Sequence, residues 1–130
     1  MTARSEALKN SFLPDRVYTL GQVVSGLTEA GFYDEAKADI DELDESDRFR
    51  TRLTIASLQA ERNDLDAAKI TLQEAIQVEL NRQPRMDWNL KEIAQAQARL
   101  RLIDEARKTI ALIIDANARS SAESYLPKQP

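Results

Sequence analysis

The sequence predicts an all-α protein, a stack of three antiparallel helical hairpins with about six helices. Three observations lead to this prediction. A similar segment recurs three times, apolar residues upstream of each copy recur at three- and four-residue steps, and the 130 residues include only 3 Gly and 4 Pro. Steps of three and four place side chains on one face of a helix. Scarce Gly and Pro leave such helices uninterrupted.

Each copy of the repeat is centred on an alanine. A large apolar residue lies three positions before it, a basic residue follows directly, and an aliphatic residue lies four positions after it. The alanines are Ala36, Ala68 and Ala106, so the copies are 32 residues apart (36 to 68) and then 38 (68 to 106). The extra length is expected around Asn81–Arg85, where Pro84 marks a break. Because each hairpin buries little surface alone, stacking is expected to form the core.

The periodicity also sets the expected boundaries. The helices are predicted over 15–30, 33–45, 47–62, 65–82, 86–100 and 103–119. These ranges define an N-terminal extension (1–13), one repeat domain (14–119, with hairpins 15–45, 47–82 and 86–119) and a C-terminal tail (120–130). Asp15 and Asp47 are candidate helix N-caps. Gly31 and Asn63 suit the left-handed turn inside a hairpin, for which Arg101 is a poorer fit.

Composition argues against several classes of function. The chain has no Cys and no His, which removes the usual zinc ligands and the commonest general base, so we expect no enzyme, no metal and no cofactor. A net charge of -4 argues against nucleic acid as a partner. The polar start and short apolar runs predict no secretion signal and no membrane span, which makes the cytoplasm the expected location.

The aligned units resemble tetratricopeptide repeats. The matching positions are a compact residue in the first helix, a large residue opening the second, and the repeat alanine; the first two sets are Val24, Ala56 and Ala94, and Tyr33, Leu65 and Ile103. The resemblance implies a right-handed stack of hairpins, a TPR-like α-solenoid. The early Trp of the family's first helix is absent, since Leu20, Arg52 and Leu90 occupy its place. A related hairpin array or a compact helical bundle remains an alternative.

The resemblance also implies where a partner binds. In the family, a peptide or helix lies along an inner wall made by first-helix residues that point away from the core. The expected partner-binding residues here are Tyr18, Gln22, Ser25, Arg50, Thr54, Ser57, Trp88, Lys91, Gln95 and Arg99, with Glu29 and Glu61 on the same wall. The Lys and Asn set with which some members clamp a C-terminal carboxylate is absent. The chain is thus expected to be a protein-interaction scaffold with a protein or peptide partner.

Several of these residues, and the apolar last helix, also fit other roles. Trp88 could instead pack over the loop around Pro84, and the acidic stretch Asp34–Asp47 is better explained as a solvated face than as a site for cations or a basic partner. Glu29 and Glu61 could form a catalytic acid and base, although a solvated pair explains them better. The second function expected is self-association as a homodimer or part of a longer array, because Ala111–Ile114 make the last helix apolar nearly all round.

Overall fold

The computed structural model describes residues 22–84 and 86–127, in which the regular structure is helical and no strand occurs. Residues 22–29 form a helical stretch. The later elements are α3 (Tyr33–Asp39), the 3-10 turn η1 (Ile40–Glu42), α4 (Glu45–Glu61), α5 (Leu65–Leu80), α6 (Asp87–Arg99), α7 (Ile103–Ala111) and α8 (Ala116–Glu123). The all-α prediction is confirmed for this part of the chain. Tyr18, the Asp15 cap and the start of the first predicted helix lie outside the described residues.

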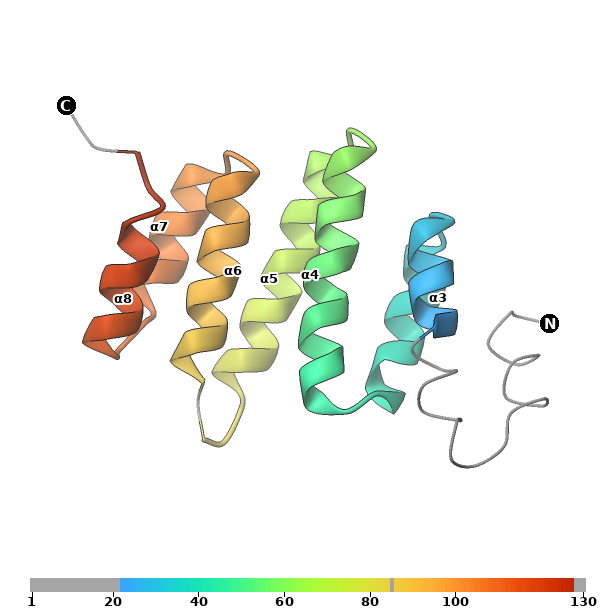
Figure 1. The fold of residues 1–130 in the computed structure, drawn as a ribbon, viewed down its shortest axis with the longest axis horizontal. Helices are drawn as coiled ribbons and strands as arrows, with labels where there is room; N and C mark the ends of the chain where they lie inside the picture. Colours follow the sequence, from blue (N-terminus) through green and yellow to red (C-terminus); the bar gives the residue numbers. More distant parts are fainter. Residues whose placement is uncertain (1–21, 85, 128–130) are drawn as a thin grey trace.

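The helices lie in two layers (Figure 1). The stretch 22–29, α4, α6 and α8 form the nearer layer, and α3, α5 and α7 lie behind it. Each helix of the nearer layer except α8 runs antiparallel to the helix that follows it in the chain. The described residues therefore form three consecutive hairpins and one additional helix.

The three hairpin turns share one backbone geometry. Gly31, Asn63 and Arg101 have positive φ values of 90°, 65° and 66°. The next residue in each turn donates its N–H to a carbonyl in the last turn of the preceding helix, from Phe32 to Leu27, Asp64 to Gln59 and Leu102 to Gln97. These bonds satisfy carbonyls that a helix end leaves free. The prediction for Gly31 and Asn63 is confirmed, and Arg101 adopts the same conformation although its side chain disfavours it.

Three sets of positions that align in the sequence are buried alike in the three hairpins. The repeat alanines Ala36, Ala68 and Ala106 are each 0% exposed. Their compact partners in the preceding helix, Val24, Ala56 and Ala94, are each 1% exposed, and the aliphatic residues one turn on, Ile40, Leu72 and Ile110, are also buried. Small side chains at these points let the paired helices approach closely, so no larger residue fits without displacement. The repeat in the sequence therefore corresponds to a repeat in packing.

Neighbouring hairpins are joined through the basic residues that follow the first two repeat alanines. Lys37 of α3 forms an ion pair with Glu74 of α5 at 2.6 Å, and Lys69 of α5 pairs with Glu105 of α7 at 2.9 Å. The hydrogen bond between Lys69 and Glu105 raises the pKa of the lysine and lowers that of the glutamate. The second helices of consecutive hairpins are thus linked in the same way twice.

The predicted helix 103–119 is wrong, because the chain breaks after Ala111 and restarts as α8. Three contacts fix the break. The Asp87 carboxylate of α6 accepts hydrogen bonds from the Ile114 and Asp115 N–H groups at 2.9 and 2.7 Å. Asp115 caps α8 by accepting from the Ala118 N–H at 2.8 Å. Consequently, part of the segment predicted as a tail, 120–123, is helical.

The start of α4 and the length of α5 also differ from expectation. Asp44, not Asp47, caps α4, and its side chain accepts from the Asp47 N–H at 2.9 Å. The predicted helix 33–45 divides into α3 and η1. The extra residues of the third unit do not lie in the link alone. They lengthen both α5, which reaches Leu80, and the connection 81–86 that follows it.

Helix α8 covers the end of the stack. It packs on α6 and α7 with Ala118 and Ala122, which are 0% and 1% exposed. Its exposed side chains include Asn117, Arg119, Ser120 and Glu123. Of the apolar run Ala111–Ile114, however, only Ile113 is buried, while Leu112 and Ile114 remain 36% and 74% exposed. In the described part of the chain, no helix combines the length and apolar character needed to cross a bilayer.

Candidate functional site

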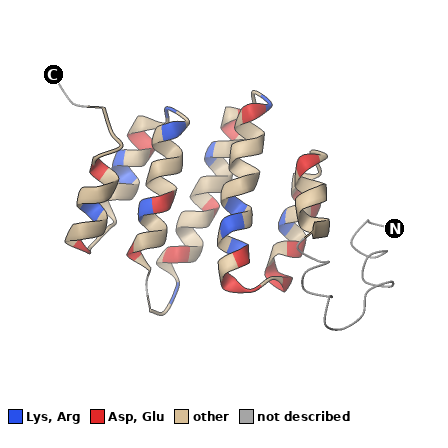
Figure 2. Cartoon of the chain, viewed as in Figure 1, with Lys and Arg blue, Asp and Glu red and all other residues tan. Residues whose placement is uncertain are grey.

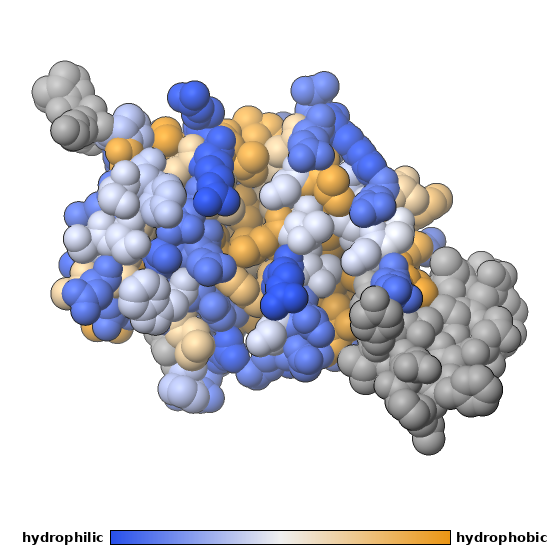
Figure 3. All heavy atoms as spheres, viewed as in Figure 1, coloured by the Kyte–Doolittle hydropathy of each residue, from blue (hydrophilic) through white to orange (hydrophobic). Residues whose placement is uncertain are grey.

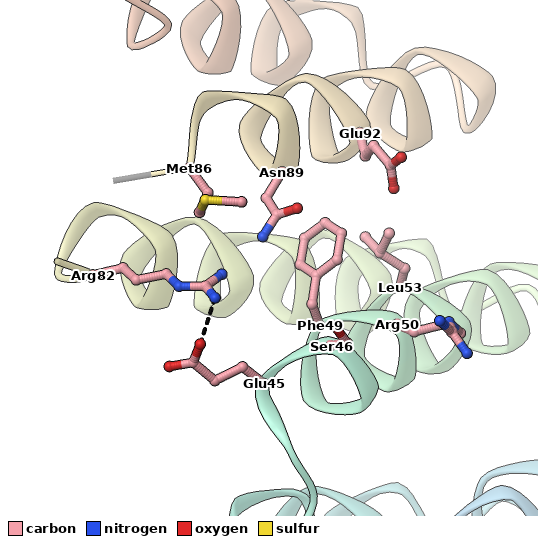
Figure 4. A pocket seen from close by; sticks show the side chains of 9 residues that line it. All are labelled: Glu45, Ser46, Phe49, Arg50, Leu53, Arg82, Met86, Asn89 and Glu92. Carbon is pink, nitrogen blue, oxygen red and sulfur yellow. Dashed lines mark hydrogen bonds and ion pairs between the residues drawn. The ribbon is translucent and has the colours of Figure 1, made fainter. Parts of the chain in front are cut away.

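An open cavity of about 230 Å³ lies between α4 and α6 on the nearer layer. Figure 4 shows its walls, with Phe49 and Leu53 projecting from α4 toward Met86, which precedes α6, and toward Asn89 and Glu92 of α6. The remaining lining residues are Glu45, Ser46, Arg50 and Arg82. Figure 3 shows hydrophobic surface between the charged side chains of these two helices. The cavity thus combines an apolar floor with a charged rim.

The apolar side chains of this cavity lie at the boundary between the core and the solvent. Phe49 and Leu53 are one helical turn apart on α4, and both pack against the main core while remaining partly exposed. Met86 is the residue that precedes α6 and is 38% exposed. The long connection after α5 brings it beside Phe49. An apolar site half open to water results.

One end of the cavity is held by a network around a buried carboxylate. Glu79 of α5 is 3% exposed, accepts from Asn89 Nδ2 at 2.7 Å and forms an ion pair with Arg82 at 3.2 Å. Arg82 also pairs with Glu45, the first residue of α4. Burial disfavours the charge on Arg82, but the hydrogen bonds that it donates to Glu79 and Glu45 outweigh this effect and raise its pKa. This network joins α4, α5 and α6 at one place.

A second cavity, of about 240 Å³, adjoins the first. Glu45, Phe49 and Arg82 line both. The second cavity is otherwise lined by Asp41, Arg48, Arg52, Val78 and Glu79. Figure 2 shows the acidic residues near the η1–α4 turn and the basic residues that follow them along α4.

Most of the predicted partner-binding residues are exposed, but few of them line a cavity. Gln22 and Ser25 lie exposed on the stretch 22–29, Thr54 and Ser57 on α4, and Arg99 at the end of α6. Arg50, whose side chain is 76% exposed, lines the cavity between α4 and α6. Tyr18 lies outside the described residues. The predicted wall and the observed cavity therefore meet at Arg50.

Gln95 was predicted on the exposed wall, and this expectation is wrong. Its residue exposure is 8%, and its Nε2 atom is buried without a hydrogen-bond partner in the structure. The reason is that α6 contacts α4, α5, α7 and α8, so more of its circumference is buried than that of a helix on an open wall. The sequence pattern gave no sign of α8 and hence none of this burial.

Trp88 and Lys91 form a contact of their own. The Lys91 Nζ atom lies 5.1 Å from the centroid of the Trp88 ring, within cation–π range. Trp88 remains 51% exposed. About half of this residue is therefore open to solvent, two positions after Met86, which lines the cavity.

The acidic stretch Asp34–Asp47 is used in several separate structural roles. Asp44 caps α4, Asp41 lies 3.9 Å from Arg52, and Asp39 is 8% exposed.

Glu29 and Glu61 lie exposed at the ends of their helices, and the Glu29 carbonyl accepts a hydrogen bond from Arg62. Within the described ranges no group of three or more acidic side chains is placed to hold a metal ion.

Sequence reasoning missed Phe49, Leu53 and Met86 as site residues. Phe49 and Leu53 belong to the apolar residues at three- and four-residue steps that predict the helix 47–62, and Met86 is the first residue of the predicted helix 86–100. A signal was available for Phe49, because the aligned position of the third unit is the charged Asp87. A core position shared by both units would not carry a carboxylate.

Comparison with protein families, with curated proteins and with solved structures gives no significant match to this chain.

Proposed function

We propose that this protein is a non-catalytic interaction module of the tetratricopeptide-like kind, which docks a peptide or helix of a protein partner on its nearer layer. The observation that carries the proposal is the apolar cavity between α4 and α6, formed by Phe49, Leu53 and Met86 and rimmed by charges. Half-exposed aromatic and aliphatic side chains in a concave site are typical anchors of recognition.

The charges around the cavity support a peptide rather than a small apolar ligand. Arg50 and Glu92 lie on opposite helices at the rim, and Glu45 and Arg82 close one end. Rim charges set orientation and register of a bound chain more than its affinity. Asn89 donates to Glu79, so its position in the wall is fixed before a partner arrives.

The matched burial of aligned positions supports the family resemblance. The alanines at the helix contacts and the large residues before them occur in each hairpin, as the right-handed TPR-like arrangement requires. Arg50, Thr54, Ser57, Trp88, Lys91 and Arg99 extend the proposed docking face beyond the cavity. The proposed location in the cell remains the cytoplasm.

The test uses peptides selected on the whole chain from a displayed random library. Their affinities for the wild type, for the double variant Arg50→Ala/Lys91→Ala and for Leu53→Gln are measured by calorimetry. We expect each variant to bind at least about tenfold more weakly, the effect of losing roughly 1.4 kcal/mol. Lys108→Ala is the matched control, because Lys108 is exposed on α7 in the other layer. Equal affinity in all variants would falsify the proposal.

Self-association is a second candidate. The observation that favours it is the exposure of Ile114 (74%) and Trp88 (51%), which the contact between Asp87 and the Ile114 N–H brings near one another. Sedimentation velocity of the wild type and of Ile114→Ser distinguishes a monomer from a self-associated form. A wild-type monomer at high micromolar concentration would eliminate this candidate.

A further inference from the structure

Three arginines line the cavity between η1, α4 and α5, and they differ in how closely carboxylates pair with them. Arg82 is held by two carboxylates, those of Glu79 and Glu45. Of the other two arginines, Arg52 pairs with Asp41, the third carboxylate of the lining, and Arg48 lines the same cavity. The Asp41 oxygen lies 3.9 Å from Arg52 Nη2, and the Asp41 side chain is 82% exposed. Among the described ion pairs of this cavity, the pair of Arg52 with Asp41 is therefore the longest, and its carboxylate is the most exposed.

Arg52 is the more constrained of the two. Its side chain is only 16% exposed. Burial lowers the pKa of Arg52, Asp41 acts in the opposite direction, and Arg48 lowers it further. Glu74 and Glu79 also stabilise the charge on Arg52, but Glu74 is bound to Lys37, and Glu79 to Arg82 and Asn89. The largely desolvated cation is thus incompletely compensated by the side chains around it.

The repeat provides an internal comparison for this position. Arg52 aligns with Leu90 of the third unit, 38 residues later, and Leu90 is 0% exposed. The same place in the architecture is therefore filled by an aliphatic side chain in one hairpin and by a guanidinium beside a cavity in another. Packing alone does not require the charge.

We propose that this arginine cavity binds the carboxylate of an aspartate or glutamate side chain carried by an acidic segment of the partner. The inference rests on the proposed function, because Glu45, Phe49 and Arg82 line both cavities and one extended segment can contact the two. Arginine forks match carboxylate oxygens in pairs. Phe49 and Val78, which is 42% exposed, offer apolar contact for the methylene groups of such a side chain.

The experiment titrates the full chain with a hexaglutamate peptide at about 0.15 M salt and follows the arginine Nε–Hε signals by NMR. We expect saturable shifts of the Arg48 and Arg52 signals. Arg52→Leu is expected to bind at least about tenfold more weakly, the effect of losing one charge-assisted hydrogen bond. This variant is expected to fold, because Leu90 occupies the aligned position. Arg48→Gln, which changes a side chain that is only partly buried, gives a second test of the same site.

The matched control is Arg101→Asn. It removes the same charge at the turn between α6 and α7, where asparagine suits the positive φ of 66°. If Arg101→Asn weakens hexaglutamate binding as much as Arg52→Leu, the binding is general charge attraction and the inference is overturned. If the selected peptides bind in a way that depends on Leu53 but hexaglutamate does not bind, this inference fails while the proposed function stands. If hexaglutamate binding depends on Arg52 while Leu53→Gln does not weaken binding of the selected peptides, the arginine site is kept and the proposed groove is removed.

Discussion

The Thr71 hydroxyl donates a 2.6 Å hydrogen bond to the side-chain oxygen of Gln59 and so joins the two helices of the second hairpin. Thr109 and Gln97 repeat this contact at the same distance in the third hairpin. All four side chains are buried. In the first hairpin the aligned residues are Leu27 and Asp39, so this bond belongs to the second and third units only.

Thr71→Val is expected to destabilise the protein by about 1–3 kcal/mol, because it leaves a buried amide oxygen without its donor. The double variant Gln59→Leu/Thr71→Val removes both polar groups and is expected to recover much of that loss. Urea unfolding followed by circular dichroism measures both. A single variant as stable as the wild type would contradict the assignment of this bond.

Ala106→Leu is expected to lower stability by about 1–3 kcal/mol or more, because the position is closed and the added atoms must displace packed neighbours. Ala111→Leu, at the exposed end of the same helix, is the control and is expected to change little. Thermal unfolding of the two variants provides the comparison. Similar melting temperatures for both would show that the alanine contact is not tightly packed.

Arg101→Gly is expected to stabilise the protein by about 0.5–1 kcal/mol. Glycine removes the strain of a positive φ, and the greater freedom of the unfolded chain offsets part of the gain. Arg99→Gly, in the last turn of α6, is the control and is expected to destabilise. A decrease in melting temperature for Arg101→Gly would mean that the arginine side chain stabilises this turn.

Asp87→Ala is expected to loosen the α7–α8 connection, because the carboxylate accepts two backbone N–H groups there. Hydrogen exchange at Ile114 and Asp115 should become about tenfold faster or more, as expected for the loss of charge-assisted bonds. Exchange in α4 should stay unchanged. Asp104→Ala provides the control, and equal exchange in both variants would refute the role of Asp87.

The Lys69–Glu105 pair predicts a defined pH dependence. The folded pKa of Glu105 is below its usual 4.5. Its contribution to folding stability is therefore present above that value and is lost as pH falls through the lower folded pKa. Because the folded pKa of Lys69 is above its usual 10.5, its contribution is present below that value and is lost as pH rises through the higher folded pKa.

Lys69→Met should therefore lower the melting temperature slightly near neutral pH, and this difference from the wild type should disappear in strong acid and strong base. Glu123→Gln, an exposed change on α8, is the control. A difference that is constant across the whole pH range would show that lost packing of the lysine stem, not charge, is responsible.

The sequence predicted the hairpins well because their determinants are local. The alanine contacts follow from one-face periodicity, and the left-handed turns at Gly31 and Asn63 follow from residues that tolerate them. Arg101 takes the same turn because the packing of α6 against α7 outweighs its preference.

The break between α7 and α8 could not be predicted in the same way. The run Ala111–Ile114 is a good helix sequence, and the contacts that interrupt it come from Asp87, a distant residue on another helix. The burial of Gln95 followed from the same helix that the sequence did not reveal. The α4–α6 cavity depends on how far two helices stand apart, which the spacing of apolar residues does not report.

The connection 81–86 between α5 and α6 is longer than the two-residue connection 43–44 between η1 and α4. Each hairpin has its own closing turn at the opposite end, so this connection is not needed to keep either helix pair together. Cutting the chain there would divide the main core, which α4 and α5 share with the later helices, and the Glu79, Arg82 and Asn89 network would be part of the surface for reassociation of the two fragments. The molecule is therefore suited to use as a split reporter, whose halves regain the docking site only when they meet.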